Sequence, residues 1–129
     1  MPDVAMVDSH VHLWDPTHFR MGWLDGNDVL DRPYGLEEYQ AQTRGLPIEA
    51  MVYLQVEVEP PYALLEAAWV AERAREDPRI KAMVPWAPLE FGEQARAFLE
   101  ALRASSPLVK GIRRLIQSES LDFCVQPRF

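Results

Sequence analysis

Two histidines separated by one residue, His10 and His12, are the side chains of this sequence best suited to metal or acid–base chemistry. They end an apolar run, residues 4–13, whose composition predicts a β-strand. Alternate side chains of a strand share a face and lie about 6.6 Å apart, so the two imidazoles can reach one ion. We therefore predict His10 and His12 as catalytic residues and as metal ligands. The cofactor we expect is a divalent metal, Zn²⁺ in the first place, or none.

The residues near the pair leave more than one interpretation open. Asp8 falls on the same predicted strand face, where its carboxylate can orient a ring nitrogen or instead close the strand. His18 follows in the loop without the spacing of a ligand, and we expect it in solvent. The single cysteine, Cys124, has no partner for an intramolecular disulfide, and we expect it to be a small apolar packing residue.

Strands and helices alternate along the rest of the chain. Apolar runs bounded by Pro, Gly or Asp predict further strands at residues 50–58, 80–89 and 109–117. Helical spacing of apolar residues predicts helices at residues 36–44, 61–76 and 92–104. The last three strands begin about 30 residues apart, the size of a βα unit, and strict alternation predicts a parallel sheet with helices packed on it.

The turn after the first strand selects between two such folds. It reads Leu13-Trp14-Asp15-Pro16 and lacks the glycines of a dinucleotide-binding turn, which favours a closed barrel over an open sheet. A (β/α)₈ barrel needs eight units, whereas four are visible. We therefore predict an α/β fold that is the N-terminal half of a TIM barrel, with four parallel strands and intervening helices. Residues 1–129 would be a partial domain that continues beyond the C-terminus.

Further site residues are expected where the strands end, since barrels place their chemistry there. Gln55 lies on a polar face of the second strand with Tyr53, Glu57 and Glu59. We expect this face in the barrel lumen; an edge strand with a solvated side is the alternative. Trp86 can stack on a substrate ring or simply pack, with equal weight. Arg113 and Arg114 must point to opposite faces; we place Arg113 inward with Gln117, and the reverse stays open. Gln55, Trp86, Arg113 and Gln117 are the predicted substrate-binding residues.

Composition excludes several classes of partner. The chain of 129 residues carries a net charge of −7 and has no basic stripe, so we expect no nucleic acid. No apolar run approaches the roughly 20 residues that cross a bilayer, so we expect no membrane contact. The N-terminus lacks the basic region of a signal peptide, and a single cysteine suits a reducing compartment. We expect a cytoplasmic protein that binds a small molecule.

The run from Asp8 to Pro16 resembles the opening signature of the amidohydrolase-related family of metal-dependent barrel hydrolases. That family includes L-fuconolactonase-like, L-rhamnonolactonase-like and pyrone-dicarboxylate lactonase-like enzymes. Residues 52–57, 83–89 and 109–117 extend the resemblance over nearly the whole chain. The resemblance implies further histidines on the fifth and sixth strands and a catalytic aspartate on the eighth, all beyond Phe129. It also implies lactonases that work with or without a divalent ion.

The function that the resemblance implies is a hydrolase that opens a small sugar-acid or carboxylated lactone by activated water. The 129-residue chain alone would be inactive, because it holds half a ligand set at most. One alternative is a carboxy-lyase, since related barrels use the same histidine pair to decarboxylate acids. The other is a non-catalytic half-barrel that self-associates through the unpaired edges of its first and fourth strands.

Overall fold

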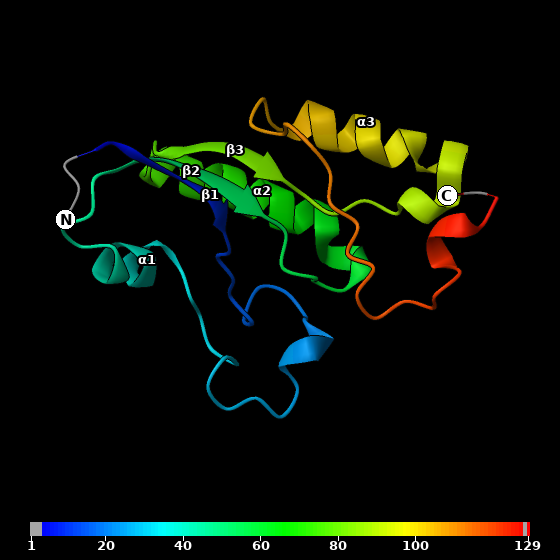
Figure 1. Ribbon diagram of the computed structural model, residues 1–129, viewed down its shortest axis with the longest axis horizontal. Coiled ribbons are helices and arrows are strands. Elements are labelled where there is room, and N and C mark those ends of the chain that lie inside the picture. Colours follow the sequence, from blue (N-terminus) through cyan, green and yellow to red (C-terminus); the bar gives the residue numbers. More distant parts are fainter. Residues whose placement is uncertain (1–3, 128) are drawn as a thin grey trace.

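The computed structural model describes residues 4–127 and 129. Residues 1–3, which entered the argument against a signal peptide, and residue 128 lie outside the described part. Three strands, β1 (Met6–Val11), β2 (Ile48–Leu54) and β3 (Ile80–Val84), alternate with the helices α1 (Leu36–Gln42), α2 (Ala63–Glu76) and α3 (Arg96–Ser105). Short 3₁₀ helices occur at Gly22–Leu24, Pro60–Tyr62, Leu89–Ala95 and Phe123–Val125. The predicted order of strands and helices is confirmed from the first strand to the third helix (Figure 1).

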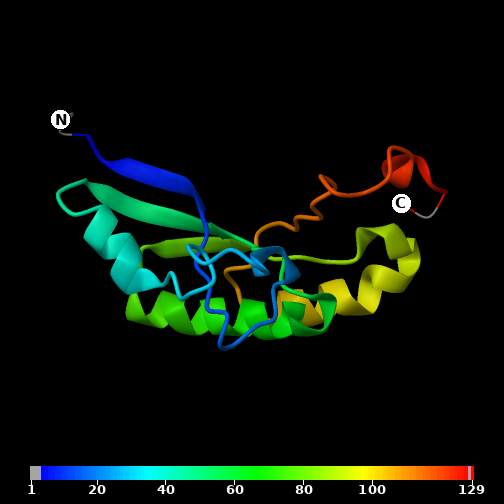
Figure 2. The same ribbon diagram turned by 90° about the horizontal axis from the view of Figure 1, so that it is seen from below.

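The three strands form one parallel sheet in the order β1-β2-β3. Figure 2 shows the helices gathered on one side of this sheet, while the C-terminal segment rises on the other side. Buried Met51 and Tyr53 of β2 and Met83 of β3 belong to one apolar cluster with Ala67 and Val70 of α2. These two helix positions lie three residues apart, on the face that a helix turns toward a sheet. The core therefore fills one face of the sheet only.

The fourth strand that we predicted is not formed. Residues 109–117 run parallel to β3 and pair with this part of the chain through isolated bridges, Met83 with Val109 and, beyond the end of β3, Trp86 with Arg113. Pro85 interrupts the end of β3 between these bridges, and a proline cannot donate to a ladder. The amide of Arg113 nevertheless donates to the carbonyl of Pro85 at 2.9 Å. The structure thus shows a three-stranded sheet with the fourth segment laid along its edge.

The ends of the predicted elements shift for local reasons. β2 ends at Leu54 rather than at residue 58, because Glu57 has a left-handed φ of 53°. The second helix starts with a 3₁₀ turn at Pro60–Tyr62 before α2 begins, and α2 ends at Glu76 as predicted. The third starts late, at Arg96, because Gly92 interrupts it with a φ of 53° and a ψ of −128°. Cys124 is exposed, so the prediction that it packs in the core is wrong.

The outer edge of β1 has no partner strand among the described residues, and Val7 on it is 64% exposed. Self-association through this edge stays a prediction. No helix in the described part of the chain combines the length and the apolar character needed to span a bilayer.

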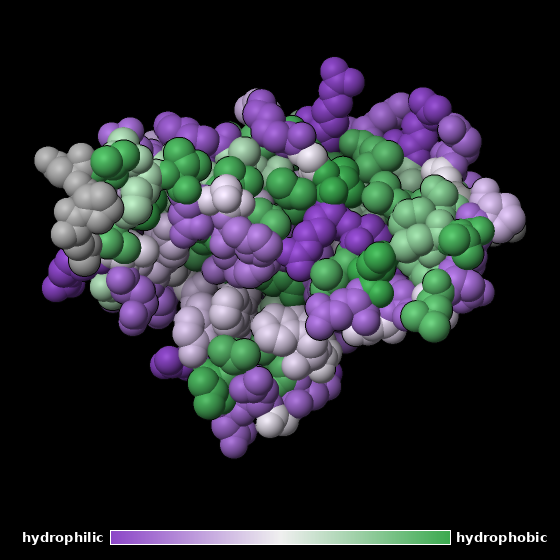
Figure 3. All heavy atoms as spheres, in the orientation of Figure 1, coloured by the Kyte–Doolittle hydropathy of each residue, from purple (hydrophilic) through white to green (hydrophobic). Residues whose placement is uncertain are grey.

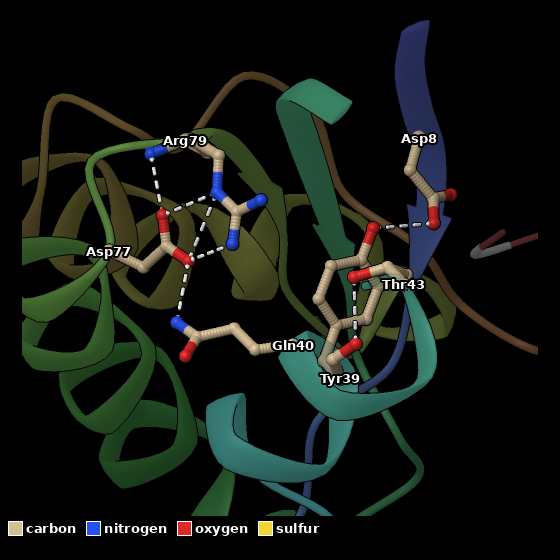
Figure 4. A network of polar contacts seen from close by, with 6 residues as sticks. All are labelled: Asp8, Tyr39, Gln40, Thr43, Asp77 and Arg79. Atoms are coloured by element: carbon tan, nitrogen blue, oxygen red, sulfur yellow. Dashed lines mark hydrogen bonds and ion pairs between the residues drawn. The ribbon is translucent and has the colours of Figure 1, made fainter. Parts of the chain in front are cut away.

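Asp77, in the turn between α2 and β3, connects this turn to α1 (Figure 4). Its carboxylate accepts hydrogen bonds from the backbone and guanidinium of Arg79, at 2.6 to 3.2 Å, and from the amide of Gln40 in α1 at 3.1 Å. These contacts, those with Arg79 above all, lower the pKa of Asp77 to about 2. On the other side of α1, the hydroxyl of Tyr39 donates to Asp8 of β1 at 2.9 Å. Asp77 and Tyr39 together connect α1 to the turn before β3 and to β1.

Asp77→Asn is expected to lower the free energy of unfolding by about 1–2 kcal/mol at pH 7, because it removes a charge from these hydrogen bonds. A carboxyl whose pKa is depressed on folding stabilises the protein above its unfolded pKa, near 3.8. That stability is lost as the pH falls toward about 2. Urea unfolding of both proteins at pH 7 and pH 2.5 should therefore show a difference that shrinks in acid. Asp28→Asn, at an exposed acid, is the control; a difference for Asp77→Asn that is the same at both pH values would contradict this account.

Candidate active site

A β-bulge in β1 sets the direction of the two histidines. Asp8 lies opposite Met51 of β2, but the next paired residue, Val11, lies opposite Tyr53, so β1 advances three residues against two. The extra residue shifts the alternation of the strand. After the bulge, Val11 and Leu13 are buried toward the helices at 4% and 2% exposure. His10 and His12 therefore point to the opposite face of the sheet.

Asp8 closes this bulge and does not orient an imidazole ring. One carboxylate oxygen accepts the backbone N–H of His10 at 3.2 Å, and the other accepts the hydroxyl of Tyr39 from α1. Of the two roles left open for Asp8, the structure shows the closing of the strand. Because Asp8 bonds to α1, it does not share the face of the histidines, as strict alternation had predicted.

The two imidazoles approach each other through their Nε2 atoms. These nitrogens lie 3.0 Å apart, and the ring centroids lie 4.8 Å apart with the planes at 81°. The Nδ1–H of His12 donates to the carbonyl of Leu54 at the end of β2, at 2.9 Å. This bond fixes the His12 tautomer and leaves its Nε2 lone pair directed at His10. The pair has the form of two ligands aimed at one point.

The charge state of His12 suits a ligand as well. Burial lowers the pKa of His12, and the neighbouring His10 and Arg113 lower it further, although the hydrogen bond to the Leu54 carbonyl acts in the opposite direction. A lowered pKa keeps the ring neutral near pH 7, which is the form that binds a metal. Two nitrogens held at about 2.0–2.1 Å from one zinc ion lie roughly 2.9–3.4 Å apart at right-angled to tetrahedral bond angles, so the spacing fits.

Within residues 4–127 and 129, no group of three or more His, Cys, Asp or Glu side chains could hold a metal ion. The described chain thus supplies two donors. A metal ion bound here would need its remaining ligands from water, from substrate or from residues other than these.

His12 lies on the wall of a cavity of about 600 Å³ where three distant segments meet. Trp14 and Trp23 come from the chain after β1, residues 55–57 follow β2, and Arg113, Leu115, Gln117 and Ser118 come from the segment beside β3. Figure 3 shows this face of the molecule, with hydrophilic side chains gathered near its middle and hydrophobic ones on both sides. The cavity opens on the face of the sheet that the helices leave free.

Three of the four predicted substrate-binding residues lie on this cavity with His12: Gln55, Arg113 and Gln117. The Nη1 of Arg113 is buried and has no hydrogen-bond partner among the described residues. Arg114 turns away and pairs with Glu90 at 2.9 Å and Glu119 at 2.7 Å. Arg113 is therefore the arginine available to a molecule in the cavity.

The fourth predicted residue, Trp86, lies elsewhere. It is 7% exposed and packs edge to face on Phe98 of α3, with ring centroids 5.8 Å apart. The guanidinium of Arg114 lies over its ring, and Trp86 lines a smaller cavity than the one that contains His12. Of the two roles weighed for Trp86, the structure therefore shows packing. The burial of its ring against a helix depends on α3, which the sequence around residue 86 does not reveal.

The polar face predicted for the second strand is corrected in the same way. Tyr53 is 1% exposed on the helix side, where its hydroxyl donates to Glu66 of α2 at 2.7 Å. A second donor to the same oxygen of Glu66 is the backbone N–H of Val56, at 2.9 Å. A buried acid on α2 therefore lets a polar strand residue face the helices rather than the lumen. Gln55 reaches the cavity only because the strand has already ended at Leu54.

Sequence reasoning missed two tryptophans and one acid of the cavity wall. The indole N–H of Trp23 donates to the carbonyl of Val56 at 2.7 Å, and that of Trp14 to the carbonyl of Leu30 at 3.2 Å. Their rings lie 6.0 Å apart. The acid is Glu57, whose left-handed backbone conformation is held by hydrogen bonds to Gln55. Trp14 could have been found from its place two residues after His12, whereas Trp23 reaches the site through a loop.

Solved structures of other proteins match this chain, among them two amidohydrolases. An amidohydrolase 2 from Bifidobacterium longum subsp. infantis matches with a TM-score of 0.70 and 22% identity, over 98% of this chain and 45% of its own. An amidohydrolase from Burkholderia multivorans with bound zinc matches with a TM-score of 0.68 and 24% identity, over 93% of this chain and 40% of its own. The chain shares the fold of part of each of these two structures.

The chain spans less than half the length of either match. No family model matches the sequence, and no curated protein does. The likeness confirms the α/β class and the parallel sheet.

Proposed function

We propose that this chain is the part of an amidohydrolase-family hydrolase that carries its histidine pair. The whole protein would open a small sugar-acid or carboxylated lactone with activated water. The observation that carries the proposal is the convergence of the His10 and His12 Nε2 atoms, with His12 Nδ1 committed to the Leu54 carbonyl. Such an arrangement needs a bulge and a bond between two strands, which a merely solvated histidine pair would not require.

The metal in this proposal is a divalent ion, zinc first, held by His10 and His12 with ligands from outside the described residues. The zinc in the Burkholderia multivorans structure and the spacing of the two nitrogens support it. When bound, such an ion supplies Lewis-acid polarisation of an ester carbonyl. Without an ion, the Nε2–H of His10 can donate to the Nε2 of His12, whose lowered pKa favours the neutral ring.

Arg113 and Gln117 would hold the substrate. Arg113 lines the cavity together with His12, and its buried Nη1 has no partner among the described residues. A guanidinium in this position can bind an incoming carboxylate or lactone oxygen. Gln117 lies on the same segment and is exposed, so its amide is free to exchange partners. A substrate held there would bring its carbonyl to the histidine side of the cavity.

The test is a substrate panel on the full-length protein. We expect acid release from one or more aldonolactones or carboxylated lactones, and no carbon dioxide from aromatic or muconate-type acids. Carbon dioxide release without lactone hydrolysis would establish the carboxy-lyase instead. Inactivity on both sets would overturn the proposed function, and metal analysis of the same preparation would show whether zinc is retained.

A further inference from the structure

The turn that follows β2, residues 54–57, holds three parts of the cavity wall. The carbonyl of Leu54 fixes the His12 ring, and the carbonyl of Val56 accepts the indole N–H of Trp23. From the other side, Glu66 of α2 accepts the N–H of Val56. Because each of these contacts uses the backbone, the turn has little freedom to move. Glu57, the last residue of this turn, therefore has a backbone held in place by the same contacts that fix the His12 ring.

Glu57 has an unusual backbone conformation. Its φ of 53° makes it the one residue other than glycine with a positive φ among the described residues. A side chain costs free energy in this region, and such residues persist where the surrounding structure enforces them. Conformations of this kind cluster at binding sites, and Glu57 lines the cavity of His12 and Arg113.

Gln55 enforces this conformation. Its side-chain oxygen accepts the backbone N–H of Glu57, and its Nε2 donates to one carboxylate oxygen of Glu57 at 2.7 Å. Gln55 is fully buried, so water does not compete for either bond. Both ends of the Gln55 amide are thus engaged by Glu57. The amide that we expected to contact a substrate directly is occupied within the protein.

The second carboxylate oxygen of Glu57 has different surroundings. No described residue donates a hydrogen bond to it or forms an ion pair with Glu57, and the residue is half-buried on the cavity. A carboxylate accepts from both oxygens and binds hydroxyl groups strongly, because one partner in the bond is charged. Trp23, anchored beside it, offers an apolar ring to the carbon side of the same molecule.

We propose that Glu57 binds a free hydroxyl group of the substrate and that Gln55 is its positioning residue. The inference rests on the proposed function and narrows it. Among lactones, it favours those with ring or side-chain hydroxyls over those whose only polar substituents are carboxylates, which Glu57 would repel. Arg113, which lines the same cavity, would then bind the ester or a single carboxylate of the substrate.

The test compares two lactones of equal ring size, one polyhydroxylated and one unsubstituted, in the full-length protein. Glu57→Gln keeps the shape but removes the charge, and should lower kcat/KM for the hydroxylated lactone by about 10- to 100-fold, mainly through KM. Gln55→Leu should give the same selective loss, because Glu57 is then no longer held. The unsubstituted lactone should change by less than about threefold for either variant. An equal loss on both lactones, or no loss, would overturn the proposal.

Glu59→Gln is the matched control. Glu59 is the next acid along the same segment, exposed and 3.6 Å from Arg20, and it does not line the cavity. The substitution Glu59→Gln should leave kcat/KM for both lactones unchanged. Thermal unfolding of each variant separates a folding defect from a site defect, since a misfolded variant loses both activities together.

A binding measurement separates this inference from the proposed function. A sugar lactam keeps the hydroxyls but replaces the ester, and its binding can be followed by tryptophan fluorescence because Trp14 and Trp23 line the cavity. If no lactone is hydrolysed, the proposed function fails, and the lactam still decides the inference. Binding that weakens about 10-fold or more in Glu57→Gln supports it. Absence of binding to the native protein, or equal binding to the variant, overturns it.

Discussion

His12→Ala is expected to lower kcat/KM for lactone hydrolysis in the full-length protein by about 10²- to 10³-fold, the largest effect of any single substitution proposed for this cavity. The substitution removes the Nε2 atom that faces His10 at 3.0 Å and frees the Leu54 carbonyl that had fixed the ring. If an ion is bound, its retention should fall too, because one of the two donors of the chain is gone. Steady-state kinetics and metal analysis on one preparation measure both effects.

His18→Ala is the matched control for His12→Ala. The side chain of His18 is 56% exposed and bonds to Asp15 at 2.9 Å in the loop after β1, outside the cavity. As expected from the sequence, it lies in solvent, and its removal should leave activity and metal content within about twofold, as for other surface substitutions. Activity of His12→Ala within threefold of native, with unchanged metal content, would show that the histidine pair is not the reactive centre.

Glu66→Ala should have the largest effect on stability, lowering the free energy of unfolding by about 2–4 kcal/mol. Glu66 is 1% exposed, and its Oε1 accepts both the Tyr53 hydroxyl and the Val56 N–H. Truncation leaves the Val56 N–H without its acceptor, leaves the Tyr53 hydroxyl only the longer bond to the Leu13 carbonyl at 3.3 Å, and opens space under β2. Glu66→Gln keeps an oxygen in the same place and should cost less than about 1 kcal/mol. Urea unfolding at one pH distinguishes the two; equal losses would mean that volume, rather than the hydrogen bonds, decides the effect.

The difference in stability between the native protein and Glu66→Gln depends on pH. Burial raises the pKa of Glu66 above its ordinary value of 4.5, against the lowering effect of its two hydrogen bonds. A carboxyl with a raised folded pKa binds its proton more tightly in the native state than in the unfolded chain. Its contribution is therefore complete below about pH 4.5 and is lost as the pH rises through the folded pKa. The stability advantage of native protein over Glu66→Gln should decline with rising pH, and parallel pH profiles would contradict this.

Local patterns predicted most of the elements because their causes are local. The alternation of apolar runs and helical spacing placed the start of β3 at Ile80, the start of α1 at Leu36 and the end of α2 at Glu76. Each of these boundaries depends on residues close in sequence, such as the acids of the first turn of α1. The histidine pair could be predicted for the same reason, because His10 and His12 are two residues apart on one strand.

The site depended on contacts that the sequence does not place. The bulge at Ser9 and His10 exists because β1 pairs with β2 in a particular register, and without it the histidine face cannot be assigned. Tyr53 was expected in the lumen because strand alternation places it on one face with Gln55 and Glu57, whereas Glu66, thirteen residues away on a helix, provides a buried partner. Glu57 follows the same rule, since its left-handed backbone is stabilised by Gln55 only after β2 has ended.

The turn at residues 54–57 has a consequence for the comparison of related sequences. The acceptors that hold His12 and Trp23 are main-chain oxygens of Leu54 and Val56, and every residue type carries one. Any apolar side chain that fits at these two positions leaves the oxygens where they are. Related proteins can therefore differ at residues 54 and 56 and still hold His12 and Trp23 in the same positions. Sequence conservation at these two positions would not reveal their role.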